Sequence, residues 1–178
     1  AGNLVFALRK LMQSGENQVV SVNLNPLVEQ IEGIINSEAL QKTARIIVEN
    51  RMSPQMHVMA EPVMLQRIII NMLSNSLNQF NHHQIATPTV SISIKPEMVN
   101  ANDGVSVEIV DNGGGFPLAV IERFGQPWSS RQPQGLGMAL MLSRQLLSIW
   151  SGRLEIANRD DGVAGARVFL WLKAASAT

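Results

Sequence analysis

The sequence contains no cysteine, and this absence excludes disulfide bonds and thiolate metal sites. It also lacks an excess of charge: 14 Lys and Arg balance 14 Asp and Glu, which gives no support to a surface for nucleic acid or acidic membranes. No apolar run approaches the ~18 residues of a membrane span, and the first residues lack the pattern of a signal peptide. The 178 residues, 46% of them hydrophobic, are typical of one globular domain with an ordinary core.

One short stretch, 110–117, combines a carboxylate with three glycines. The apolar run 105–110 predicts a strand that ends directly before Asp111. Gly113 and Gly115 follow, and glycine lets the backbone take a positive φ or approach a ligand closely. Alone, this pattern could be an Asp-Gly turn, and such turns are far commoner than ligand sites. Two companion motifs, an Asn-rich helix upstream and a pair of glycines downstream, favour a ligand site.

The upstream motif lies on a long helix that Glu61-Pro62 opens and that runs to about Phe80. Its buried stripe is expected to be Leu65, Ile68, Ile69, Met72, Leu73 and Leu77. A second set, at i, i+4 and i+7, shares a different face: Asn71, Asn75 and Asn78. Asn is a poor mid-helix residue, so three on one face indicate a function, although a solvated face is the alternative.

The remaining elements follow from alternation and turn signals. Strands are expected at 19–23, 45–49, 56–59, 89–95, 105–110, 153–158 and 164–172. A further helix should open at Asn25-Pro26, with Asn25 as its capping residue and Leu27, Ile31, Ile34 and Ile35 as its apolar face. Another should open at Gly135 and run to about Trp150. The segment 116–134 is interpreted as a partly ordered lid with Phe124 and Trp128 as apolar anchors. This order predicts an α/β two-layer sandwich with helices on one face.

Three motifs in fixed order resemble those of sensor histidine kinases. Residues 71–76 are similar to the N box of that family, 111–115 to its G1 box and 135–139 to its G2 box. Residues 165–169 resemble, more weakly, its final glycine box. The resemblance runs from about 19 to 172 and implies the Bergerat ATP-binding fold, an α+β sandwich with a mixed sheet and a flexible ATP lid.

The resemblance implies ATP and Mg²⁺ as ligands. Asp111 would accept a hydrogen bond from the exocyclic amine of adenine, where guanine presents a carbonyl. Asn75 would supply an oxygen to Mg²⁺, and Asn71 would help to hold the metal or its waters, so these two are the implied catalytic residues. The helix that begins near Leu136 offers free N–H groups to phosphate. The residues implied in ATP binding are Asn75, Asn78, Asp111, Gly113, Gly115, Arg131, Gly135, Leu136, Gly137 and Ala166.

The sequence departs from the family pattern at several of these positions. The lysine often found three residues after the metal-binding Asn is Asn78 here. Arg131 is a candidate substitute for that charge, and a solvated loop arginine is an equally good interpretation. Pro133 replaces a common glycine, and Ala166 replaces a threonine beside the last glycine. Each departure bears on nucleotide affinity and not on the fold.

The histidine that accepts phosphate in this family has no match. None of His57, His82 and His83 is followed by an acidic residue. Residues 4–12 have helical spacing and resemble the end of the dimerising helical hairpin that carries the acceptor. We therefore expect a remnant of that hairpin at 1–15 and the catalytic ATP-binding domain at 16–178.

The expected protein is a protein-histidine kinase of a two-component system. Its implied partners are its own dimerisation and phosphotransfer domain, within a homodimer, and a response regulator. The domain is expected to be cytoplasmic, with an inner-membrane anchor left open for the full-length protein. One alternative is a degenerate, non-catalytic nucleotide- or partner-binding module. An ATP-hydrolysing relative is disfavoured, because Asn71 stands where such enzymes place the Glu that activates water.

Overall fold

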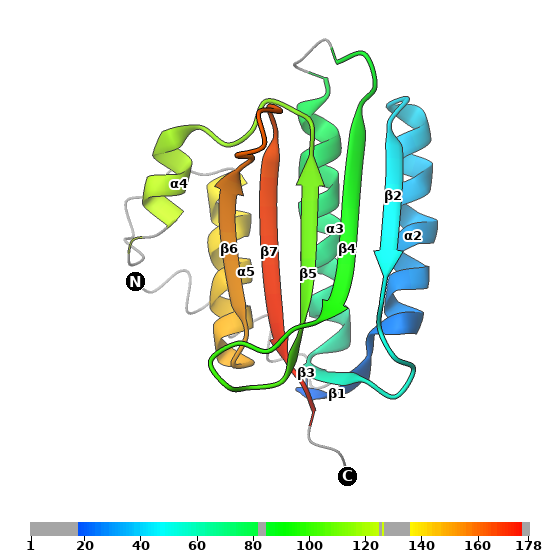
Figure 1. The fold of residues 1–178 in the computed structure, drawn as a ribbon, viewed down its shortest axis with the longest axis vertical. Helices are drawn as coiled ribbons and strands as arrows, with labels where there is room; N and C mark the ends of the chain where they lie inside the picture. Colours follow the sequence, from blue (N-terminus) through cyan, green and yellow to red (C-terminus); the bar gives the residue numbers. More distant parts are fainter. Residues whose placement is uncertain (1–17, 82–84, 125, 127–135, 176–178) are drawn as a thin grey trace.

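A five-stranded sheet forms one layer of the protein (Figure 1). The computed structural model describes residues 18–81, 85–124, 126 and 136–175. The strand order is β2-β4-β5-β7-β6, with β2 parallel to β4 and the other neighbours antiparallel. The strands are β2 (Arg45–Asn50), β4 (Thr89–Pro96), β5 (Gly104–Asp111), β6 (Arg153–Asn158) and β7 (Ala166–Lys173). The sheet is therefore mixed, as the family resemblance implies.

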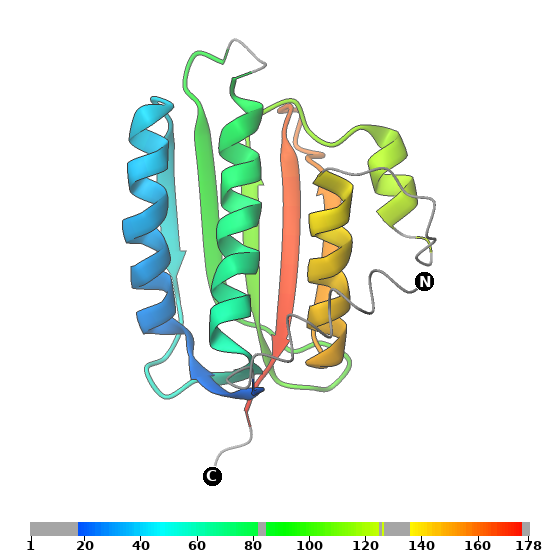
Figure 2. The same cartoon turned by 180° about the vertical axis from the view of Figure 1, so that it is seen from behind.

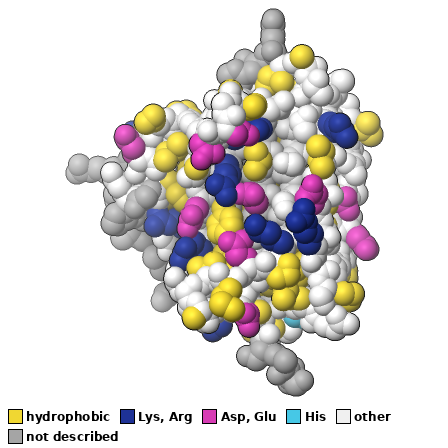
Figure 3. Space-filling view, viewed as in Figure 1, with side chains coloured by type: hydrophobic (Ala, Val, Ile, Leu, Met, Phe, Trp, Pro, Cys, Tyr) yellow, Lys and Arg dark blue, Asp and Glu magenta, His cyan; other side chains and the backbone are white. Residues whose placement is uncertain are grey.

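Three helices cover one face of this sheet, as Figure 2 shows. They are α2 (Leu24–Gln41), α3 (Pro62–Gln79) and α5 (Leu136–Ile149). The outer face of the sheet carries basic side chains beside acidic ones (Figure 3), including Arg153 paired with Glu155 at 3.2 Å. The two-layer sandwich with helices on one face is confirmed. Among the described residues, no helix combines the length and the apolar character that crossing a membrane would require.

The core lies between the helices and the inner face of the sheet. Alternate residues of the central strands point into it, as in Val105, Val107 and Ile109 of β5. All six residues of the predicted α3 stripe are buried. Leu73, near the middle of this stripe, is fully buried. This packing fixes α3 over β5, which brings the Asn-rich helix next to the end of the strand that carries Asp111.

A small second sheet closes the other end of the sandwich. It pairs β1 (Val20–Asn23) with β3 (His57–Ala60) antiparallel, so all seven predicted strands are present. The prediction that Asn25 caps α2 is wrong: Asn23 is the N-cap, and its Oδ1 accepts from the N–H of Asn25 at 3.0 Å. The prediction for Ile34 is also wrong, since it is 49% exposed and Val28 takes its place in the buried face.

The segment 116–134 contains a helix that the sequence analysis did not predict. Helix α4 (Leu118–Phe124) begins where the carbonyl of Pro117 accepts from the N–H groups of Val120 and Ile121. It ends on Phe124, which is buried as predicted. Apolar residues at 120, 121 and 124 carry the helical spacing. Trp128, Arg131 and Pro133 lie outside the described residues.

Candidate functional site

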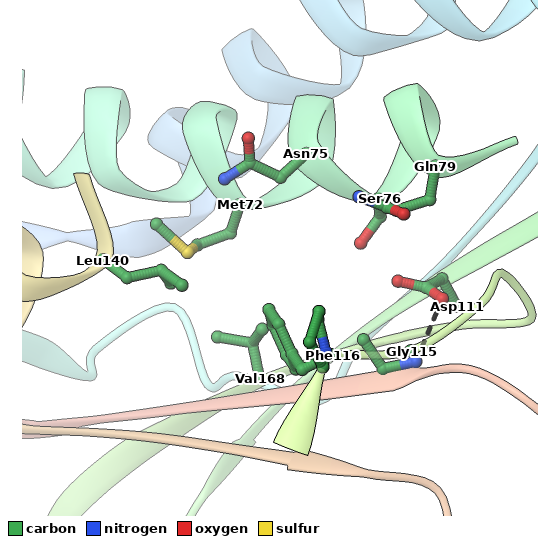
Figure 4. Close-up of a pocket in the computed structure, with 11 residues that line it drawn as sticks. Met72, Asn75, Ser76, Gln79, Asp111, Gly115, Phe116, Leu140 and Val168 are labelled. Atoms are coloured by element: carbon green, nitrogen blue, oxygen red, sulfur yellow. Dashed lines mark hydrogen bonds between the residues drawn. The ribbon is translucent and has the colours of Figure 1, made fainter. Parts of the chain in front are cut away.

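A pocket lies between α3 and the ends of β5 and β7, and we call it the Asp111 pocket. Figure 4 shows Met72 and Asn75 of α3 on one side, and Phe116, Gly115 and Val168 on the other. Leu140 of α5 and Asp111 lie at its two ends. The lining residues are Met72, Asn75, Ser76, Gln79, Asp111, Gly115, Phe116, Pro117, Leu140, Ala166 and Val168. Most of the residues that line the pocket are apolar, and its polar side chains belong to α3 and to Asp111.

Asp111 is the one charged residue among the described residues that line the pocket, and only 1% of its surface is exposed. Its Oδ1 accepts two backbone hydrogen bonds, from the N–H of Gly113 at 2.9 Å and from the N–H of Ala166 at 3.0 Å. No group among the described residues donates to Oδ2. Fixed by two amides, the carboxylate leaves this second oxygen free to accept from a ligand that enters the pocket.

Glycines let the chain close tightly around Asp111. Gly165 has φ of +153°, and a Cβ there would lie 1.9 Å from the carbonyl oxygen of Asp111. Gly115 has φ of +77°, and its Cβ would lie 2.7 Å from Oδ1 of Asn158. At Gly113 a Cβ would meet Asp111 Oδ1 at 3.1 Å. Larger residues would push these segments apart and displace Asp111.

The turn between β6 and β7 carries an arginine that also binds the Asp111 backbone. Arg159 Nη1 donates to the carbonyl oxygen of Asp111 at 3.3 Å, and its Nε donates to Asp161 Oδ1 at 3.0 Å. The hydrogen bond from Arg159 lowers the pKa of Asp161, and the same bond raises the pKa of Arg159. Arg159 therefore stays charged and joins the turn to the end of β5.

The three asparagines of α3 do not share one environment. Asn75 is half-buried and lines the pocket, on the side of the pocket that α3 forms in Figure 4. Asn71 and Asn78 are exposed and are not among the lining residues. Among the described residues no cluster of three His, Asp or Glu could hold a metal ion. Of the three asparagines of α3, Asn75 is thus the one that a ligand in the pocket would meet.

The structure describes only some of the other residues that the resemblance implies in ATP binding. Ala166 lines the pocket and is 6% exposed, and its backbone N–H donates to Asp111 Oδ1. Leu136 and Gly137 form the first turn of α5, and Leu140, one turn later, reaches the pocket. Arg131 and Gly135 lie outside the described residues.

Sequence reasoning missed several residues that line the pocket. Ser76 is a polar residue that is buried in the middle of a helix. Its position on the apolar stripe, three residues after Leu73 and next to Leu77, was a usable signal in the sequence. Gln79 lies one turn after Asn75, and Phe116 directly follows the glycines. Leu140 and Val168 looked like ordinary core residues, because their apolar character fits a helix face and a buried strand equally well.

Known proteins resemble this chain in sequence. Residues 60–176 match the family model described as histidine kinase-, DNA gyrase B-, and HSP90-like ATPase. The sensor protein FixL of Bradyrhizobium diazoefficiens is 24% identical over 170 residues, covering 96% of this chain and 32% of FixL. The sensor histidine kinase ZraS of Escherichia coli O157:H7 is 22% identical, covering 95% of this chain and 34% of ZraS. The chain thus spans about a third of the length of these relatives.

Solved structures share the fold. The catalytic domain of histidine kinase ThkA superposes with a TM-score of 0.66 at 17% identity, covering 88% of this chain and 95% of that domain. Full-length ShkA in complex with AMPPNP superposes with a TM-score of 0.69 at 18% identity, covering 98% of this chain and 36% of ShkA. Because the family model matches more than half of the residues, this chain belongs to the histidine kinase-, DNA gyrase B- and HSP90-like ATPase family.

Proposed function

We propose that this chain is the ATP-binding catalytic domain of a sensor histidine kinase. It binds ATP in the Asp111 pocket, and the γ-phosphoryl group passes to a histidine on an adjoining dimerisation domain. In the full-length protein this domain works within a homodimer and serves a response regulator. The proposal places the domain in the cytoplasm. The remnant of the helical hairpin that the sequence predicts at 1–15 lies outside the described residues.

The observation that carries the proposal is the environment of Asp111. Two backbone amides hold Oδ1, so Oδ2 presents an acceptor at the end of an apolar pocket. Adenine offers its exocyclic amine as a donor and a flat apolar ring for the walls. Guanine has a carbonyl at the same position and would place two acceptors face to face.

The phosphates would extend along α3 towards Asn75 and the first turn of α5. Free N–H groups at the start of a helix favour an anion, which suits the backbone at Leu136 and Gly137. The neutral oxygen of Asn75, with phosphate oxygens and water, fits the oxygen ligands that Mg²⁺ prefers. Bound Mg²⁺ would neutralise charge on the phosphates. Asn71, one turn earlier and exposed, would contact the metal's waters.

Two departures from the family pattern leave the described pocket intact. The group of residue 166 that binds Asp111 is its backbone N–H, which alanine supplies as well as threonine. Asn78 is exposed and is not a lining residue, so the missing lysine removes no wall of the pocket. These observations favour a working nucleotide site over a degenerate module that binds only a partner.

The proposal is tested in two steps. Calorimetric titration of the chain should show ATP binding that strengthens with Mg²⁺ and exceeds GTP binding. The full-length protein, given γ-labelled ATP, should then acquire an acid-labile, base-stable label on a histidine. Absence of binding at millimolar ATP would contradict the nucleotide site. Binding without any label in the full-length protein would instead support the non-catalytic module.

A further inference from the structure

We propose that Asn158 is a positioning residue of the nucleotide pocket, which holds the ring of Phe116 in place as a pocket wall. This inference rests on the proposed function, because it concerns the affinity of the same pocket for nucleotide. Asn158 ends strand β6, and Phe116 follows β5 by five residues, so the two meet only through the fold. Figure 1 shows the chain after β5 passing the turn between β6 and β7 on its way to α4.

Asn158 and the backbone of Phe116 form a closed pair of hydrogen bonds. The N–H of Phe116 donates to Asn158 Oδ1 at 2.6 Å, and Asn158 Nδ2 donates to the carbonyl oxygen of Phe116 at 2.9 Å. The carboxamide of Asn158 thus uses both its N–H donor and its oxygen acceptor on the backbone of Phe116. The pairing imitates a strand ladder and fixes the backbone of Phe116 in both translation and rotation.

The backbone of Phe116 needs such support because its neighbour is a glycine. Gly115 has φ of +77° and no side chain to restrict it, so the chain can swing there. On the other side Pro117 starts the turn into α4 and cannot donate a hydrogen bond. Apart from Asn158, no described group bonds the N–H or the carbonyl of Phe116. The carboxamide of Asn158 therefore decides where this residue lies.

The position of Phe116 matters because its ring faces the pocket. Figure 4 shows Phe116 beside Val168 and across from Met72. A planar base between these walls would pack on the ring, and a stacked aromatic contact adds affinity beyond that from area burial. If the backbone moves, that contact loosens, while Asp111 stays held by its own two amides.

Asn158 is exposed and does not belong to the hydrophobic core, so its loss should leave the folded protein intact. A matched control exists at the far edge of the sheet. Asn50 ends β2, is also exposed, and also uses its carboxamide twice: Oδ1 accepts from the N–H of Met52 at 3.0 Å and Nδ2 donates to Asn25 at 2.8 Å. Asn50→Ala therefore removes the same groups away from the pocket.

The test measures ATP affinity by calorimetry and stability by denaturant unfolding. Asn158→Ala should weaken ATP binding roughly threefold to tenfold, while Asn50→Ala changes it less than twofold. Asn158→Asp keeps the acceptor for the Phe116 N–H but loses the donor, and it should also weaken binding. If Asn158→Ala does not fold, Asn158→Asp serves as the test variant in its place. Unchanged affinity in a folded Asn158 variant would overturn the inference.

A double-mutant cycle shows whether Asn158 acts through the ring. In a Phe116→Ala background, Asn158→Ala should change ATP affinity less than twofold, because the wall it positions is gone. Independent, additive losses would overturn the inference. Failure of the unmutated chain to bind ATP would reject the proposed function and this inference together. Normal binding that Asn158 does not influence would reject the inference alone.

Discussion

The guanidinium of Arg144 lies over the ring of Phe124, with its central carbon 5.2 Å from the ring centroid. The same guanidinium donates a hydrogen bond from Nη1 to the carbonyl oxygen of Phe124. Arg144 belongs to α5 and Phe124 is the last residue of α4, so one side chain both covers and caps the short helix. Seven residues are too few for a helix to be stable alone, so α4 depends on tertiary contacts, and this contact with α5 is one of them.

Arg144→Ala should therefore release α4. The change removes a cation–π contact and a charged hydrogen bond, and we expect a loss of about 1–2 kcal/mol in unfolding free energy. Amide exchange of residues 118–124 should quicken more than that of α3. Arg123→Ala, at an exposed position of α4, serves as the control. Unaltered exchange in α4 would show that its packing does not depend on Arg144.

Asn75→Ala should separate metal-dependent from metal-independent binding. The carboxamide lines the pocket where phosphates and Mg²⁺ would lie, and the apolar walls do not involve it. We expect the gain in ATP affinity on adding Mg²⁺ to shrink about tenfold, with little change in its absence. The measurement is a calorimetric titration with Mg²⁺ and with chelator, and Asn78→Ala is the exposed control. Equal losses in both buffers would assign Asn75 a packing role.

Asp161→Asn should alter stability in a pH-dependent way. The hydrogen bond from Arg159 lowers the pKa of Asp161 in the folded protein, so the pair stabilises the fold above the unfolded pKa of about 3.9. The contribution is lost as pH falls through the lower, folded pKa. The raised pKa of Arg159 lies beyond any practical pH.

Melting temperatures from pH 7 to pH 2 test this pair. The parent should melt higher than Asp161→Asn at pH 7, and the gap should close at acid pH. Asp160→Asn removes a neighbouring charge without removing the ion pair and serves as the control. A gap that persists undiminished at pH 2 would rule out the ionised pair as its cause.

The isolated chain should acquire no stable label from γ-labelled ATP. His57 lies in β3, at the end of the sandwich opposite Asp111 (Figure 1), and its Nδ1 donates to the carbonyl of Gln55 at 3.0 Å. His82 and His83 lie outside the described residues and lack the acidic neighbour of an acceptor. Acid-labile radioactivity that disappears in a His57→Ala variant would contradict this expectation.

Sequence periodicity was sufficient to predict the layers of the fold. Strands β4 and β6 alternate because one face packs on helices, and α3 keeps its buried stripe for the same reason, so local pattern and tertiary packing agree. Helix α4 was missed because Pro and Gly around it suggested a loop, whereas Arg144, twenty residues away, stabilises it. The apolar spacing at 120, 121 and 124 was a usable signal, but the contact with Arg144 leaves no periodic pattern in the sequence.

The site could be predicted only where a motif carries it. Asp111 and Asn75 stand in recognisable contexts, and the structure brings both to one pocket. Asn158 ends an ordinary strand, and only the fold shows that its carboxamide meets Phe116. Ile34 has the same spacing as buried residues of α2 but lies on the solvent side, because the helix packs through a narrower stripe than its apolar residues suggest.

The central claim is that Asp111 recognises adenine, and Asp111→Asn tests it. The carboxamide oxygen can replace Oδ1 and accept from Gly113 and Ala166, so the fold should survive. The amide NH₂ then replaces Oδ2 and turns a donor towards the donor of adenine.

Calorimetric titration of the parent and of Asp111→Asn with ATP and GTP is the most direct measurement. Glu108→Gln removes a carboxylate from the same strand at the outer-face ion pair with Arg167 and serves as the control. We expect ATP binding by Asp111→Asn to weaken by about 1–3 kcal/mol, roughly fivefold to 150-fold, and the preference over GTP to disappear. ATP binding by Asp111→Asn as tight and as selective as that of the parent would contradict the account.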